Sequence, residues 1–134
     1  MFDVIVIGGG HAGVEAAHAV YRQGLNCCLV TFKTETIGQM SCNPAIGGLG
    51  KSHLVREVDA LGGIMAQATD LSGIQSRTLN TRKGFAVQAL RVQCDRDKYK
   101  QAIQELLLET NITIKEGEVV DIMLEQNTIL GVEL

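Results

Sequence analysis

The sequence has no long apolar run and no recognisable targeting segment. Hydrophobic residues make up 46% of its 134 residues, yet no run of them approaches the roughly 20 residues that a membrane-spanning helix needs. The start, MFDVIVIGGG, lacks the basic segment and the cleavage site of a signal peptide. We therefore expect a soluble, cytoplasmic protein without a membrane partner, in which residues 1–134 belong to a single domain.

Disulfide and metal-binding patterns are also absent. The four cysteines form neither a CxxC pair nor a Cys/His ligand spacing, which predicts free thiols. Cys27 and Cys28 lie in an apolar segment and are expected to be buried, whereas Cys94 precedes a predicted helix and is expected to be partly exposed. No Ser-His-Asp arrangement or carboxylate pair stands out.

The net charge of −3 conceals a basic segment over residues 77–100. Its charged residues are Arg77, Arg82, Lys83, Arg91, Asp95, Arg96, Asp97, Lys98 and Lys100. Such asymmetry can mark a surface that faces a polyanion, and it is equally compatible with a solvated basic face.

The first third of the chain has the pattern of a βαβ unit. DVIVI is a short apolar run that ends at three glycines, as a buried parallel strand does. HAGVEAAHAVYRQG has helical spacing and ends at Gly24, and LNCCLVTF follows as a second buried strand. The sequence therefore predicts an α/β fold with a parallel sheet.

Later segments give weaker signals. A helix is predicted over SHLVREVDALGG, with Ser52 as its cap and with Leu54, Val55, Val58 and Leu61 on one helical face. Residues 64–93 are expected to be irregular, with one or two short strands. Residues 95–110 have the pattern of an amphipathic helix, and ITIKEG, EVVDIMLEQ and NTILGVEL are predicted strands, the last two joined as a hairpin near residues 125–127.

Gly8, Gly10 and Gly13 form a G-x-G-x-x-G motif between the first strand and the helix. In this context the N-terminal amides of the helix can contact a pyrophosphate. Gly8 permits the tight turn, Gly10 leaves room for a phosphate, and Gly13 allows the helix and the strand to pack closely. A purely structural turn is the alternative. The motif also requires an acid at the end of the second strand, where Thr31 to Lys33 offer none. Either Glu35 reaches back, or Thr31 or backbone groups hold the ribose.

The stretch GQMSCNPAIGGLG places Cys42 shortly before a glycine run that leads into the helix near Lys51. A thiolate is the reactive form of cysteine, and it is favoured near positive helix ends. Glycines here also let backbone approach a ligand. Cys42 is therefore either a reactive, exposed thiol or a buried cysteine in a structural turn.

Three segments together resemble a known family. GGGHAGVEAA, TIGQMSCNPAIGGLGKSHLVREVDALGG and GIQSRTLNTRKGFAVQALRVQCDRDKY are similar to the amino-terminal part of MnmG, also called GidA, and the resemblance covers essentially the whole chain. It implies the amino-terminal, truncated part of a Rossmann-like FAD-binding domain, with a parallel sheet and an added hairpin. It further implies a flavoenzyme that builds a carboxymethylaminomethyl or aminomethyl group on C5 of the wobble uridine of tRNA.

The resemblance also implies cofactors, partners and site residues. The family works with an MnmE-type GTPase, uses methylenetetrahydrofolate as the carbon donor and NADH at a site outside this chain, and forms homodimers. Carried over, the FAD pyrophosphate loop is Gly8, Gly9, Gly10, His11, Ala12 and Gly13. Cys42 matches a cysteine required for activity, as a nucleophile or acid/base. Val119, or Val120 by a shift of one, matches a backbone contact to adenine.

The sequence departs from the family at Phe85, where KGPAV is usual and KGFAV stands here. The basic segment around it faces either tRNA or the flavin phosphates. Two other functions stay open at this point: a different flavin-dependent oxidoreductase, and a non-catalytic nucleotide-binding module.

Overall fold

The computed structural model describes residues 1–134, which divide into two compact units. The first unit combines Met1–Ile37 with Leu107–Leu134, and the second unit is Gly38–Leu106. None of the helices has both the length and the apolar content needed to cross a membrane.

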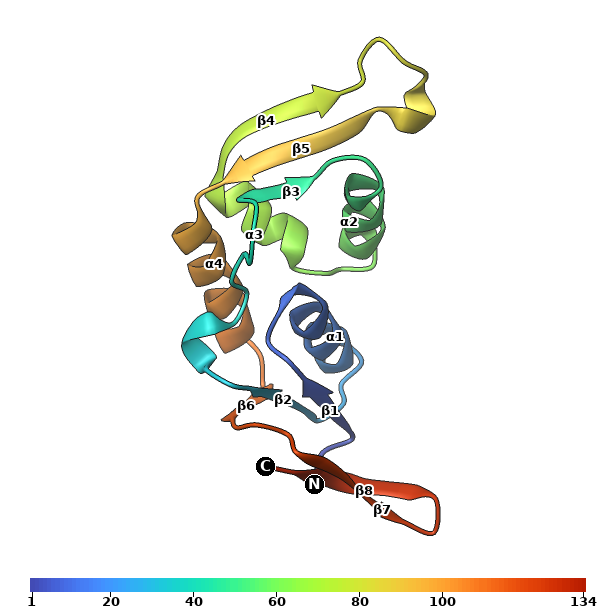
Figure 1. Cartoon of the computed structure of the whole chain (residues 1–134), viewed down its shortest axis with the longest axis vertical. Helices are drawn as coiled ribbons and strands as arrows, with labels where there is room; N and C mark the ends of the chain where they lie inside the picture. The colour runs from blue at the N-terminus through green and yellow to red at the C-terminus, as the bar shows by residue number, and fades with distance from the viewer. The chain divides into compact units, whose positions relative to one another are not determined.

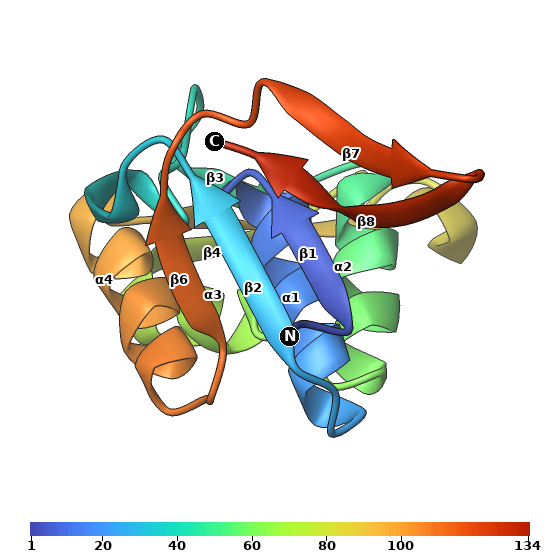
Figure 2. The same ribbon diagram turned by 90° about the horizontal axis from the view of Figure 1, so that it is seen from below.

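The first unit is built on a parallel sheet of three strands. β1 (Val4–Ile7), β2 (Cys27–Thr31) and β6 (Thr113–Glu116) lie in the order β1-β2-β6. All five residues of β2 are buried, as expected for a central strand of β-branched and small apolar residues. Helix α1 (His11–Arg22) covers one face of the sheet, and the later hairpin lies on the other side (Figures 1 and 2). The predicted α/β fold with a parallel sheet is confirmed.

Helix α1 ends where the sequence predicts. Gly24 has φ +74, and its N–H donates to Tyr21 O at 2.9 Å while the N–H of Leu25 donates to Val20 O at 3.3 Å. These two bonds satisfy carbonyls of the last turn, and the left-handed conformation that they need favours glycine.

The predicted hairpin is also present. β7 (Asp121–Glu125) and β8 (Thr128–Glu133) pair antiparallel, and a turn of two residues joins them (Figure 2). Gln126 and Asn127 both have positive φ, of 46° and 64°. This is the turn geometry that matches the right-handed twist of two strands.

The second unit contains an antiparallel sheet with two helices packed against it. Its strands β3 (Ala45–Gly47), β5 (Ala89–Cys94) and β4 (Gly73–Leu79) lie in that order, and β4 and β5 form a long ribbon (Figure 1). Helices α2 (Lys51–Ala60) and α3 (Met65–Ser72) contact the sheet. Helix α4 (Arg96–Leu108) starts in this unit and confirms the amphipathic helix predicted over residues 95–110, with Tyr99 and Ile103 buried.

Several expectations for the second unit are wrong. Residues 64–93 contain the strands β4 and β5, in line with the one or two strands expected there, but they also contain helix α3 and are not mainly irregular. Strand β3 was not expected. Ser52 does not cap α2: the N-cap residue is Gly50, and Ser52 is buried in the first turn. Leu54 and Leu61 are 62% and 81% exposed, because the side of α2 that lines the cavity against the sheet carries Ser52, Val55, Arg56 and Asp59.

Cys94 is buried, with 3% of its surface exposed, and the expectation of partial exposure is wrong. It is the last residue of β5, where it pairs with Gly73, and its N–H donates to Pro44 O at 2.8 Å. The cysteine therefore ends an inner strand of the sheet. Cys27 and Cys28 are buried as expected, and all four cysteines are free thiols.

Candidate dinucleotide-binding site

The glycine turn connects β1 to α1 in the predicted way. Gly8 has φ +104, a conformation that favours glycine, and its N–H donates to Val30 O at 2.7 Å. Gly10 is the N-cap residue of α1 in an extended conformation, and its carbonyl accepts the N–H of Val14 at 2.9 Å. The chain thus turns sharply from the end of a strand into the start of a helix.

Two glycines of the turn are required by packing. A Cβ atom at Gly13 would lie 1.8 Å from the carbonyl oxygen of Gly8, so any side chain there would push the helix away from the turn. A Cβ atom at Gly9 would lie 2.9 Å from Ile37 Cγ1 and 3.0 Å from Thr31 Oγ1. Close approach of helix and strand therefore depends on both positions.

Gly10 differs from Gly9 and Gly13, because a Cβ atom there would meet nothing within 4 Å. The protein leaves open space in front of the helix, where a bound group can approach the backbone. Such space beside the first turn is what an anionic ligand needs.

The start of α1 is electrostatically suited to an anion. The first amides of a helix have no acceptor within that helix, and here they include those of Ala12 and Gly13. No side chain caps this end and no acidic residue lies in the first turn. The positive end of the helix dipole therefore meets no acidic residue of its own first turn, and a diphosphate fits it.

A cavity of about 270 Å³ lies beside the glycine turn. Val119 lines it, whereas Val120 is 64% exposed and does not. Thr31 also lines it, while Lys33 and Glu35 do not. The full lining is Ile7, Gly8, Gly9, Gly10, Val30, Thr31, Phe32, Thr36, Gly117 and Val119.

The volume suits one part of a dinucleotide, since whole ligand pockets span about 300–1,000 Å³. Phe32, Thr36 and Gly117 were not singled out from the sequence. Their only signal was position: Phe32 and Gly117 end the predicted strands LNCCLVTF and ITIKEG, and Thr36 follows the first of these. The carboxyl ends of parallel strands share one edge of a sheet.

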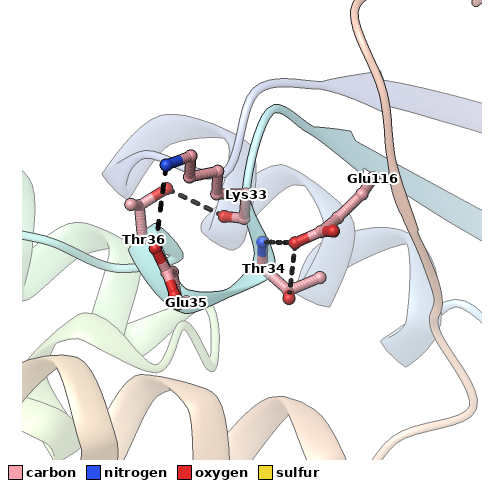
Figure 3. A network of polar contacts seen from close by, with 5 residues as sticks. All are labelled: Lys33, Thr34, Glu35, Thr36 and Glu116. Atoms are coloured by element: carbon pink, nitrogen blue, oxygen red, sulfur yellow. Dashed lines mark hydrogen bonds and ion pairs between the residues drawn. The ribbon is translucent and has the colours of Figure 1, made fainter.

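An acid does lie at this edge, but it comes from β6. Glu116 Oε1 accepts the backbone N–H of Thr34 at 2.6 Å and its hydroxyl at 2.8 Å (Figure 3). These bonds, the backbone one first, hold the pKa of Glu116 below its ordinary value. Glu35 instead lies 4.0 Å from Lys33 Nζ, and both side chains are largely exposed. Glu116 therefore positions the segment that follows β2, and the ordered acid at this edge is one that the sequence pattern did not indicate.

Cys42 lies in the second unit, exposed on a loop that is fixed on both sides. Arg96 Nη2 donates to Met40 O at 2.5 Å, and the N–H of Cys94 donates to Pro44 O at 2.8 Å. Exposure agrees with the reactive-thiol interpretation and contradicts the buried alternative. The glycine run after it contains strand β3, and α2 then begins at Lys51 as predicted.

The sequence profile of the family described as glucose inhibited division protein A matches residues 3–134. The chain belongs to this family. Structures of Aquifex aeolicus GidA in two crystal forms are 52% identical to it, with a TM-score of 0.94 over 98% of this chain. The match covers 22% of the Aquifex protein, so the chain spans about a fifth of that protein's length.

More distant structures have the same fold. The GidA-related protein from Thermus thermophilus is 14% identical, with a TM-score of 0.59 over 98% of this chain and 45% of that protein. Glycine oxidase from Bacillus cereus is 19% identical, with a TM-score of 0.57 over 98% of this chain and 52% of that protein. The chain thus has the Rossmann-like, FAD-binding fold of the GidA family.

Proposed function

We propose that this chain is the FAD-binding portion of a tRNA-modifying flavoenzyme. With a GTPase partner of the MnmE type, the enzyme adds a carboxymethylaminomethyl or aminomethyl group to C5 of the wobble uridine. The observation that carries the proposal is the 52% identity to Aquifex GidA over 98% of this chain. NADH and methylenetetrahydrofolate are part of the same proposal, as reductant and carbon donor.

The residues of the first unit would hold the coenzyme. The amides of the first turn of α1 bind its diphosphate, and the missing side chain of Gly10 leaves the space for it. The backbone of Val119 contacts the adenine, and Thr31 or a backbone group holds the ribose. FAD, when bound, supplies the redox chemistry of the reaction.

Cys42 is the candidate catalytic residue of the second unit. Its exposed thiol is available either to attack a carbon or to move a proton, and the bonds at Met40 and Pro44 fix the loop that carries it. Serine keeps the size of the side chain but loses the acidity and the nucleophilicity of a thiol.

The experiment uses the full-length protein that carries this chain. It is purified, its visible absorption is recorded for flavin, and it is incubated with its GTPase partner and unmodified tRNA, whose uridines are then analysed by mass spectrometry. Cys42→Ser is expected to abolish the modification, while Ser41→Ala, an exposed neighbour on the same loop, leaves it intact. A wild-type protein without flavin and without modified uridine would overturn the proposed function, whereas an active Cys42→Ser protein would remove only the thiol.

A further inference from the structure

Two arginines lie directly opposite each other in the β4–β5 ribbon. The register pairs Arg77 with Arg91, and the next pair on the same face is Gln75 with Gln93. Directly opposite side chains in an antiparallel pair have Cβ atoms about 5 Å apart, and like charges in this position destabilise the pair. The arrangement is unfavourable for the sheet alone, and a bound anion between the two arginines would remove the repulsion.

The polar groups of this face are not satisfied by the chain. Arg91 Nε and Gln93 Oε1 are buried atoms without a hydrogen-bond partner. Neither Arg77 nor Arg91 forms an ion pair with a carboxylate. Buried polar groups in native proteins normally have partners, and one that has none marks a place where a ligand or ion can bind.

The face is also hollow and open. A cavity of about 250 Å³ is lined by Gln75, Arg77, Leu79, Arg91 and Gln93, with no acidic residue among them. On the other side of β5, the strand β3 places Gly47 opposite Arg91 and Ala45 opposite Gln93, so no long side chain covers the arginines.

The opposite face of the same ribbon has a different role. Leu90 and Val92 line a separate cavity together with residues of α2 and α3. Side chains alternate between the two faces of a strand, so Arg91 and Gln93 point away from these helices. The arginine face, defined as Gln75, Arg77, Arg91 and Gln93, is therefore not part of the hydrophobic packing of the second unit.

Two facing guanidinium groups with flanking amides suit a phosphate. The planar fork of arginine binds two phosphate oxygens at once, and a phosphate placed between the pair neutralises the repulsion that the sheet otherwise carries. A glutamine amide turned by 180° exchanges its oxygen for an N–H₂ donor, so Gln93 can also bind a phosphate oxygen.

The surroundings distinguish a nucleic acid from a coenzyme phosphate. A loop joins β4 to β5 (Figure 1). It carries Arg82, Lys83 and Phe85, and Phe85 is 91% exposed. Basic groups beside an exposed aromatic ring are typical of surfaces that hold a strand by its phosphates and stack a base. The dinucleotide, by contrast, has a single diphosphate, which the start of α1 already fits.

We propose that the arginine face binds a phosphodiester group of the RNA substrate, with Phe85 at the end of the ribbon available to stack on a base. The identity of the RNA as tRNA rests on the proposed function. Arg77 and Arg91 are binding residues in this scheme and take no part in the chemistry at uridine.

The test measures tRNA binding by the flavin-loaded, full-length protein in a series of salt concentrations. Arg77→Gln, Arg91→Gln and the double variant are compared with Lys98→Gln, which removes the same charge from an exposed position on α4. Each arginine variant is expected to bind tRNA about tenfold more weakly, with the slope of log Kd against log salt reduced by about 1. Lys98→Gln should stay within about twofold of wild type.

Two further measurements separate this role from a structural one. Without RNA, Arg77→Gln is expected to unfold at a higher temperature than wild type, because a like-charge pair is removed. Millimolar inorganic phosphate should raise the unfolding temperature of wild type and not of the double variant. A lower unfolding temperature for Arg77→Gln together with normal tRNA affinity would assign the pair to the fold alone and overturn the inference.

The remaining outcomes are equally decisive. Loss of flavin from the arginine variants with tRNA affinity retained would assign the face to the coenzyme phosphates, against the inference. Tight wild-type binding of tRNA with unaltered variants overturns the inference and leaves the proposed function standing. A wild-type protein that binds no tRNA overturns both.

Discussion

Replacing Gly10 by alanine tests the glycine turn most directly. The backbone of Gly10 has φ −76° and ψ −177°, which alanine adopts without strain, and the added methyl group meets no atom within 4 Å. Loss of a glycine N-cap destabilises a helix by about 1 kcal/mol or less. The variant should therefore fold, and any loss of coenzyme reflects the space in front of the helix.

The expected loss of affinity follows from what the methyl group displaces. It occupies the position from which a phosphate would accept bonds from the first amides of α1. Each lost hydrogen bond to a charged group costs about 1.5–3 kcal/mol, which corresponds to a Kd for FAD about ten to a hundred times higher.

Two alanine substitutions serve as controls. Gly84→Ala also fills open space at an N-cap, with φ −57°, and should leave FAD affinity unchanged. Gly13→Ala forces a carbon to within 1.8 Å of Gly8 O, so it should destabilise the fold by about 3 kcal/mol. Flavin fluorescence titration and thermal unfolding of the full-length proteins give both quantities. Wild-type FAD affinity in Gly10→Ala would refute the assignment of the diphosphate to this turn.

Two other predictions concern side chains of the structure. Because the pKa of Glu116 is lower in the folded chain than its ordinary 4.5, the carboxylate stabilises the fold above that pH, and the contribution is lost as the pH falls through the folded pKa. Glu116→Gln should therefore lower the unfolding temperature at neutral pH and converge with wild type in acid, and a difference that stays constant with pH would contradict this. Under native conditions iodoacetamide should label Cys42 before Cys27, Cys28 and Cys94, because burial raises the pKa of those three thiols and blocks access to them. Peptide mapping by mass spectrometry measures the order, and early labelling of Cys94 would contradict the structure.

The parts of the fold that the sequence predicts are those with local signals. β1, α1 and β2 follow from two apolar runs and a glycine motif within one short segment, and the hairpin turn follows from its position between two strands. The sequence left Val119 and Val120 open, because a shift of one residue cannot be fixed without the sheet. In the structure Val119 lines the cavity beside the glycine turn.

The parts of the fold that the sequence does not predict lack the apolar pattern that marks a helix or a strand. In α3, Thr69 and Ser72 are buried, and their hydroxyls donate to the carbonyls of Met65 and Ala68, at 2.7 Å and 2.6 Å. These bonds allow the two hydroxyls to be buried. Because Thr69 and Ser72 are polar, the buried side of α3 does not show the apolar pattern that predicts a helix. In β4 the first six residues are exposed on both faces, so the alternation that marks a strand is absent.

The order of elements along the chain affects when the coenzyme cavity can exist. β2 pairs with β6, with Cys28 beside Thr113, although the whole second unit lies between these two strands in the sequence. The wall of the cavity includes Gly117 and Val119, which follow β6. Contacts this distant in sequence are slow to form, because a long loop must close first. During synthesis on the ribosome the glycine turn emerges before β6, so the sheet beside the turn lacks its third strand until β6 follows. Until then an edge of β2 is unpaired and open to association with other chains.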